Sequence, residues 1–185
     1  MNIRKLLILC AAALALSACG GGGGDLIETP TVAVPNDKTL SPGTYKLTFT
    51  AISTARLSVP ITGFDVPVKF PAGLSVRTLT GGSGEIAPTS LTPGSAIRST
   101  YLSAIAYGSY SASTRTAYIQ MPITLDNYRG GNFLNLYFTV AAGFSVTPNS
   151  IYALNAGIDP FYKVVGGPSA IDITGSVKTT LGVEQ

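Results

Sequence analysis

Few residues in this chain of 185 carry side chains suited to catalysis near neutral pH. Histidine is absent, so the commonest general base and the commonest metal ligand are both missing. Cysteine occurs twice, as Cys10 and Cys19. The sequence contains neither a G-x-S-x-G nucleophile motif nor a phosphate-binding P-loop. These features predict a protein that is not an enzyme and that holds no metal or other cofactor.

The carboxylates of the region after residue 40 are thinly spread along the chain. Two carboxylates can act together in glycoside hydrolysis, but the spacing here selects no pair. We interpret them as solvated or turn-capping groups. Asp126-Asn127 has oxygen atoms that suit calcium, and turn formation by the same side chains is the interpretation we favour. The full set is Asp65, Glu85, Asp126, Asp159, Asp172 and Glu184.

Tyrosines form the other group of candidate site residues. Four of them fall between residues 101 and 118, in a segment rich in Ser, Thr and Ala. Exposed aromatic rings serve as platforms for saccharides, although tryptophan, the strongest platform residue, is absent. Tyrosine also suits half-buried strand positions, which is the alternative interpretation. The candidate ligand-binding residues are Tyr101, Tyr107, Tyr110 and Tyr118.

The first 18 residues have the pattern of an export signal. Residues 1–5 include Arg4 and Lys5, residues 6–16 are apolar throughout, and the small pair Ser17-Ala18 follows. A charged start, a short apolar run and a small-residue cleavage site define a secretory signal peptide. The apolar run is shorter than the roughly 20 residues that a membrane-spanning helix needs.

The four residues Leu16-Ser17-Ala18-Cys19 resemble the lipobox of bacterial lipoproteins. The resemblance implies cleavage after Ala18, a diacylglyceryl group on Cys19 and acylation of the new amine. Two or more acyl chains anchor a protein stably in a membrane, where one is marginal. Gly20 stands where aspartate would favour inner-membrane retention, so the resemblance implies the outer membrane, on its periplasmic or cell-surface face. Ordinary secretion is the alternative.

Composition separates a tether from a folded domain. Residues 20–24 are all glycine, and prolines follow up to residue 35, so residues 19–40 are expected to form a flexible lipidated tether. Val32 and Val34 leave open a short first strand within it. The remaining residues, 41–185, have the length of one domain.

Charge is sparse in this chain. Charged residues make up 11% of it against 45% hydrophobic residues, and the formal charge of +3 falls by two when Arg4 and Lys5 are removed. A soluble protein usually carries about 25% charged residues. No basic run occurs, which excludes a nucleic-acid-binding surface of the usual kind.

Alternation of apolar and polar residues predicts strands throughout the domain, because side chains on a strand point to opposite faces in turn. The runs are separated by Gly- and Pro-rich turns, and no helical period is evident after residue 25. Such a series predicts an all-β antiparallel sandwich or barrel. Pro67 cannot donate a ladder hydrogen bond, so its strand should lie at an edge or contain a bulge there. The clearest runs are 46–52, 63–70, 74–76, 116–123 and 133–140.

Three segments resemble strands of cohesin-type domains, which belong to a carbohydrate-binding-like superfamily. They are residues 61–76, residues 130–140, and Ile171 to Val177 as the closing strand. The resemblance implies a jelly-roll β-sandwich of about nine strands over residues 41–185 and a general binding role on a bacterial surface. Dockerin recognition is not carried over, because this chain has no EF-hand-like calcium loop and a single copy sits behind a lipid anchor.

These observations predict a lipid-anchored envelope protein that displays a non-catalytic, cohesin-like binding module. Its expected role is protein–protein interaction or surface assembly. One alternative is a carbohydrate-binding module with a tyrosine-rich face, and another is a purely structural envelope lipoprotein. The expected partners are the membrane, through Cys19, and a protein or polysaccharide.

Overall fold

The computed structural model describes residues 32–97, 106–124, 128–156 and 163–185 of the chain. Residues 31–185 form one compact unit. Four residues singled out from the sequence, Cys19, Tyr101, Asp126 and Asp159, lie outside the described residues, and so does the expected signal peptide, 1–18.

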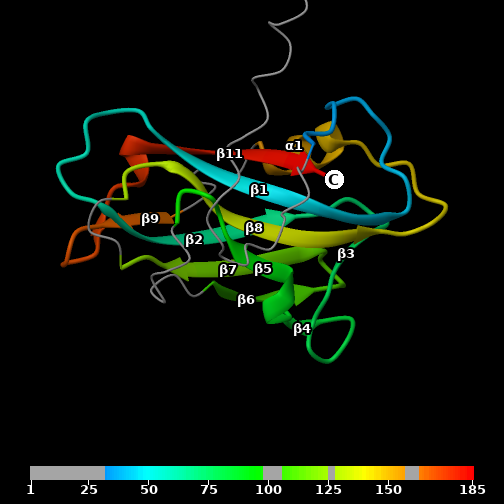
Figure 1. Ribbon diagram of the computed structural model, residues 1–185. Coiled ribbons are helices and arrows are strands. Elements are labelled where there is room, and N and C mark those ends of the chain that lie inside the picture. Colours follow the sequence, from blue (N-terminus) through cyan, green and yellow to red (C-terminus); the bar gives the residue numbers. More distant parts are fainter. Residues whose placement is uncertain (1–31, 98–105, 125–127, 157–162) are drawn as a thin grey trace, which may run out of the picture. The chain divides into compact units, whose positions relative to one another are not determined.

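Two antiparallel sheets pack face to face, which confirms the all-β sandwich (Figure 1). The five-stranded sheet has the order β11-β1-β8-β3, with β5 also paired to β8, and the six-stranded sheet has the order β10-β9-β2-β7-β6-β4. The strands of the first sheet are β1 (Gly43–Ser53), β3 (Leu74–Val76), β5 (Leu91–Pro93), β8 (Gly131–Val140) and β11 (Val177–Glu184). Those of the second are β2 (Ile61–Lys69), β4 (Gly84–Glu85), β6 (Tyr107–Ser111), β7 (Thr116–Pro122), β9 (Lys163–Gly166) and β10 (Ile171–Asp172).

The strands expected from alternation are present at β1, β2, β3, β7 and β8. The described residues hold eleven strands where about nine were expected, and two of the eleven are only two residues long. The expected closing strand at residues 171–177 is misplaced. Ile171 and Asp172 pair with β9, a 3-10 turn (Thr174–Ser176) follows, and the strand that closes the sandwich is β11.

The inward faces of the two sheets make a continuous aromatic core. Phe64 of β2 stacks on Phe133 of β8 with ring centroids 3.7 Å apart and an interplanar angle of 7°. Phe49 of β1 and Tyr128 approach the same pair at 6.1 and 6.2 Å. Because Phe64 belongs to one sheet and Phe133 to the other, this contact joins the two layers directly.

A second aromatic group joins the sheets nearer the β3 end. Phe138 of β8 lies 5.9 Å from Tyr45 of β1 and 5.8 Å from Phe70, which directly follows β2. Phe70 in turn meets Tyr110 of β6 edge to face at 6.3 Å. Aromatic pairs at such distances and angles add to the free energy gained by burial alone.

A short helix, α1 (Pro148–Asn155), was not expected from the sequence. Thr147 and Ser150 form a reciprocal capping box at its start, with Pro148 in the first turn, so local chemistry rather than an apolar period specifies it. At its end, the buried Asn155 accepts from the Lys69 N–H at 2.8 Å and donates to the Lys69 carbonyl at 2.9 Å. Among the described residues, no helix is both long and apolar enough to cross a membrane.

Pro67 lies where the described pairing of β2 with β9 has ended. That pairing runs from Ile61 to Asp65, while β7 pairs with β2 along its other side as far as Lys69. The direction of the backbone N–H and C=O groups alternates along a strand. The backbone groups of Asp65, Pro67 and Lys69 therefore all point to the side of β2 that faces β9. Lys69 meets Asn155 on that side, so the missing N–H of Pro67 costs no described ladder bond. The predicted edge strand is nevertheless wrong, because β2 lies between β9 and β7, and the described register shift falls between Ile61 and Gly63 and not at Pro67.

Residues 32–40, assigned to the tether from the sequence, pack on the sandwich instead. Ala33 forms an isolated bridge with Glu184, and the Val34 N–H donates to the Val183 carbonyl at 2.9 Å. Leu40 is fully buried. The valine alternation at Val32 and Val34 therefore marks an extended segment along β11, and the folded unit begins before residue 41.

Truncation of Phe133 tests the contact between the sheets. Phe133→Ala should lower the free energy of unfolding by about 3–5 kcal/mol, because it removes buried contacts from both layers and leaves a cavity. The control Leu79→Ala alters a side chain that is 59% exposed and should change it by about 0.5 kcal/mol at most. Urea unfolding followed by circular dichroism measures both. Equal losses would contradict the role given to Phe133.

Stability should decline above about pH 10. Burial raises the pKa of the Tyr128 hydroxyl well above its ordinary value of about 10. Below that pH both states hold the proton and this stabilisation is complete; above it only the unfolded state releases the proton, so the free energy of unfolding falls. Tyr128→Phe should make that decline shallower between pH 9 and 11. Equal slopes for the two proteins would show that Tyr128 makes no contribution.

Candidate functional site

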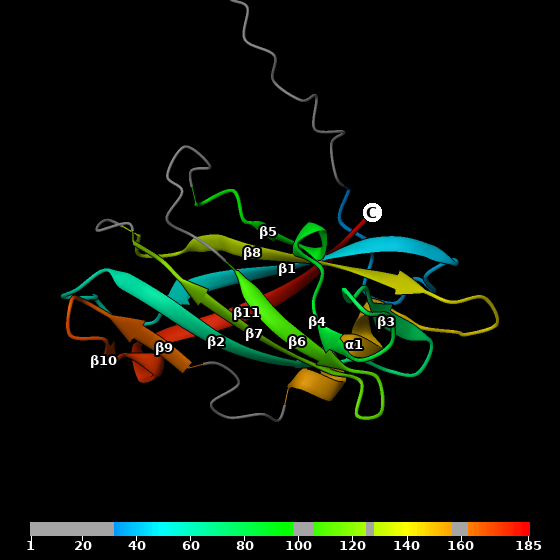
Figure 2. The same cartoon turned by 90° about the horizontal axis from the view of Figure 1, so that it is seen from below.

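Strands β2, β7 and β6 run side by side in the six-stranded sheet (Figure 2). An open hollow lies on the outward face of these strands. Its volume is about 380 Å³. We call it the tyrosine hollow. The residues that line it are Asp65, Val66, Pro67, Glu85, Tyr107, Gly108, Ser109, Tyr118, Ile119 and Gln120.

Strand register brings two of the predicted tyrosines together here. Tyr107 of β6 is opposite Gln120 of β7, and Ser109 is opposite Tyr118, so the two tyrosines are diagonal neighbours on one face. Diagonal positions in an antiparallel pair are about 7–8 Å apart. Tyr107 is 51% exposed and Tyr118 is 58% exposed, so both rings are open to a ligand.

Gly108 sets the close approach of β6 to β7 between these rings. A Cβ atom at this position would lie 2.2 Å from the Tyr118 carbonyl oxygen, which is main chain and cannot give way cheaply. Glycine is therefore required for the strands to meet as they do. The alternation of β6 then places Tyr107 and Ser109 outward, with the small Ser109 leaving space beside Tyr118.

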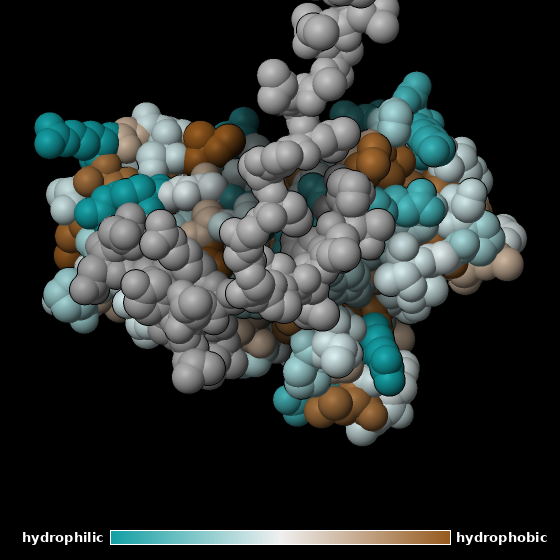
Figure 3. Space-filling model, viewed as in Figure 1, coloured by the Kyte–Doolittle hydropathy of each residue, from teal (hydrophilic) through white to brown (hydrophobic). Residues whose placement is uncertain are grey.

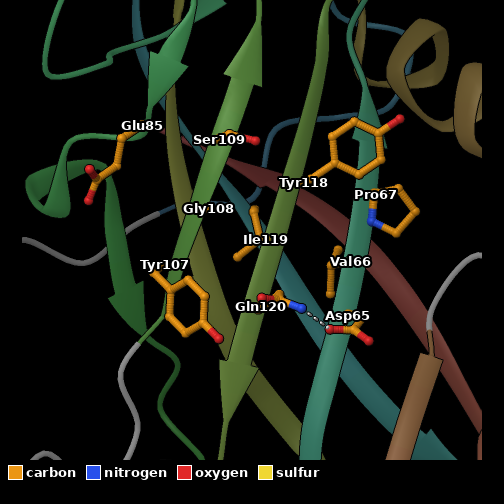
Figure 4. Close-up of a pocket in the computed structure, with 10 residues that line it drawn as sticks. All are labelled: Asp65, Val66, Pro67, Glu85, Tyr107, Gly108, Ser109, Tyr118, Ile119 and Gln120. Carbon is orange, nitrogen blue, oxygen red and sulfur yellow. Dashed lines mark hydrogen bonds between the residues drawn. The ribbon is translucent and has the colours of Figure 1, made fainter.

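Polar groups complete the lining. Gln120 Nε2 donates to Asp65 Oδ1 at 3.0 Å across β7 and β2. Figure 4 shows Tyr107 and Tyr118 at opposite corners of the hollow, with Glu85 and Asp65 at the other two. The lining includes two carboxylates and neither lysine nor arginine. Such a surface favours an uncharged or cationic ligand over an acidic one.

The two carboxylates of the tyrosine hollow lack the separation used in glycoside hydrolysis. Asp65 is on β2 and Glu85 on β4, with β7 and β6 between them. Three inter-strand spacings place their backbones about 14 Å apart, whereas paired catalytic carboxylates lie roughly 5–9.5 Å apart. Figure 4 shows the two carboxylates at opposite corners of the hollow, with neither pointing toward the other, so the pair does not converge as a glycosidase pair does.

Of the other predicted tyrosines, Tyr110 is not on this surface. Tyr110 is 3% exposed and donates its hydroxyl to the Leu74 carbonyl at 3.3 Å, so it belongs to the core and not to an exposed platform. Burial raises the pKa of Tyr110, and the nearby positive charge of Arg115 partly opposes that rise. Tyr101 lies outside the described residues. The same segment thus supplies both alternatives weighed from the sequence, an exposed ring at Tyr107 and a buried one at Tyr110.

The polar members of the hollow were not identified from the sequence. The sequence indicates Asp65 only as an isolated carboxylate and gives no reason to select Gln120. The alternation of β2 and β7 did place both on outward positions, but their pairing depends on the register between strands 55 residues apart in the chain. Within the described ranges, no group of three or more His, Cys, Asp or Glu residues is arranged to hold a metal ion.

Comparison with models of protein families, with curated proteins and with solved structures finds no match to this chain.

Proposed function

We propose that this protein is a lipid-anchored, non-catalytic binding module that recognises a saccharide through the tyrosine hollow. The observation that carries the proposal is the pair of exposed rings, Tyr107 and Tyr118, held diagonally on a rigid sheet face. The anchor is proposed from the lipobox-like Leu16-Ser17-Ala18-Cys19. The jelly-roll topology and the cohesin-like relationship are proposed from the resemblance of residues 61–76, 130–140 and 171–177 to strands of cohesin-type domains.

A saccharide matches this lining in two ways. Its C–H faces are apolar and weakly positive, and they complement the negative face of a tyrosine ring. Its hydroxyl groups both donate and accept, and the lining offers carboxylate acceptors at Asp65 and Glu85, an amide at Gln120 and a hydroxyl at Ser109. The absence of lysine and arginine from this lining favours a neutral or amino sugar over an acidic polysaccharide.

A protein partner is the competing occupant of the same face. Exposed tyrosines are common anchors in protein interfaces, and the cohesin-like pattern favours such a role. We favour the saccharide because the surface is hollowed and carries two carboxylates, whereas the core of a protein interface is depleted in charge. Figure 3 shows apolar residues scattered in small groups among polar ones on the face that it views, outside the grey atoms.

Substitution of the two tyrosines tests the saccharide site. On a glycan array and then by calorimetry with the glycan that binds best, Tyr107→Ala and Tyr118→Ala should each weaken affinity by about tenfold, the equivalent of about 1.4 kcal/mol. Tyr118→Phe keeps the ring and should retain most of the affinity. The matched control is Tyr137→Ala, which removes a half-buried tyrosine from β8 in the other sheet.

Two outcomes would contradict the saccharide proposal. One is glycan binding that survives both alanine substitutions in a folded protein. The other is an array without signal together with a protein captured from envelope extracts whose binding requires Tyr107 and Tyr118, which would assign the same face to a protein partner.

The lipid anchor has its own test. Cys19→Ala should shift the protein from the membrane fraction to the soluble fraction, because the thiol that would carry the diacylglyceryl group is gone. Cys10→Ala is the matched control and should leave the distribution unchanged, since Cys10 lies within the expected signal peptide. Mass spectrometry of the mature N-terminal peptide measures the modification directly, and an unmodified Cys19 thiol in membrane preparations would refute it.

A further inference from the structure

A second hollow lies apart from the tyrosine hollow, between β3 and the turn that joins β6 to β7. Its volume is about 510 Å³. We call it the arginine hollow. It is lined by Leu74, Ser75, Val76, Arg77, Thr78, Gly81, Gly82, Tyr110, Ala112 and Arg115. The lining includes two arginines and no carboxylate, the reverse of the charge found in the tyrosine hollow.

Arg115 is positioned by a left-handed backbone conformation and by a hydrogen bond from its Nε atom. Its φ of 51° is left-handed, which is uncommon for a residue other than glycine, and its Nε donates to the Phe70 carbonyl at 3.3 Å. The Phe70 N–H donates back to the Arg115 carbonyl at 2.8 Å. Because Nε is engaged, the two terminal nitrogens of the guanidinium remain available as a fork.

Arg77 is the second arginine in the lining of this hollow. It follows β3, is exposed, and its carbonyl accepts from the Ala87 N–H at 3.0 Å, which fixes its backbone. Within the described residues no ion pair involves either Arg77 or Arg115. Two unneutralised arginines on one hollow repel each other, and an anion between them removes that repulsion.

Thr78 provides an independent indication of a ligand. The residue is 6% exposed, and its Oγ1 is buried without a hydrogen-bond partner. Buried polar groups are nearly always paired, and an orphan costs stability unless something unseen satisfies it. Thr78 is one of the residues that line the same hollow as both arginines, and a hydroxyl group can donate to an oxyanion.

We propose that the arginine hollow binds a phosphate-type tetrahedral oxyanion, with Arg77 and Arg115 as forked donors and the Thr78 hydroxyl as a third donor. Gly81 and Gly82 leave the remaining side open, since each has a left-handed backbone and nothing within 4 Å of a Cβ position. The phosphate can be free, or part of a lipid headgroup or a phosphorylated glycan. The proposal is independent of the tyrosine hollow.

Titration of the full-length protein in detergent with sodium phosphate tests the site, with chloride at equal ionic strength as the reference. Calorimetry should give saturable phosphate binding, and phosphate should raise the midpoint of thermal unfolding where chloride does not. Arg77→Gln and Arg115→Gln should each weaken binding by about tenfold. The matched control Arg56→Gln removes an exposed arginine outside this hollow and should leave affinity within about twofold.

Thr78→Val separates a ligand role from a purely structural one. The valine has nearly the same shape and removes the orphan hydroxyl, so stability without phosphate should hold or rise while phosphate affinity falls by about tenfold. Because Arg115 also supports the fold, Arg77→Gln keeps the test decisive if Arg115→Gln fails to fold. Phosphate binding absent in the wild type, or unchanged in Arg77→Gln and Thr78→Val, would overturn the proposal.

The source of the phosphate is resolved by competition among soluble probes. Inorganic phosphate, glycerol phosphate and glucose 1-phosphate are titrated under the same conditions. Tightest binding of glycerol phosphate assigns the site to a lipid headgroup, tightest binding of glucose 1-phosphate assigns it to a glycan phosphate, and equal binding of all three assigns it to the phosphate group alone.

Discussion

The packing of the two sheets against one another is the interaction on which the rest of this structure depends. Its centre is the Phe64–Phe133 stack, with ring centroids 3.7 Å apart and one ring from each sheet. Both cysteines of the chain, Cys10 and Cys19, precede residue 32, so no disulfide within residues 32–185 adds to the stability of this packing. The long strands therefore bury most of their large apolar side chains between the sheets, and this leaves recognition to the outward positions and the loops.

Both hollows lie outside the packed core, and β6 contributes residues to each of them. Its outward residues, Tyr107 and Ser109, line the tyrosine hollow, while its inward residue Tyr110 reaches the edge of the core beneath the arginine hollow. Carboxylates line only the first hollow and arginines only the second. Among the described residues, no ion pair joins a carboxylate of the tyrosine hollow to an arginine of the arginine hollow. The domain can therefore present two surfaces of different selectivity without a change in fold.

The fold was more predictable from the sequence than the sites were. Strand alternation at β1, β2, β7 and β8 is a local signal with a period of two, and it is visible in the sequence because one face of each strand is buried.

Helix α1 was missed because its eight residues are specified by the Thr147 cap and Pro148, and the helix is too short to show an apolar period. The closing strand was misplaced because Ile171–Asp172 and β11 are both apolar-polar runs, and only pairing with β9 or β1 distinguishes them. Tyr107 and Tyr110 are three positions apart, so on a single strand they face opposite ways. Which of the two faces the core could not be predicted before the bounds of β6 were known. The Asp65–Gln120 pair and the arginine hollow depend on register and on loop placement, for which the sequence contains no local signal.

The openness of the tyrosine hollow bears on how a lipid anchor and a saccharide site would work together. Two rings and a few polar groups on an open sheet face bury only part of a ligand, whereas tight small-molecule sites enclose most of it. Binding by one copy is therefore expected to be weak, because the loss of freedom on association is offset by few contacts. Anchored copies on a membrane meet a polysaccharide with repeated units at high local concentration, and the second contact then costs far less than the first. Under the proposed function, weak individual sites on a tethered module would give firm attachment to a repeating polymer and still release single sugars.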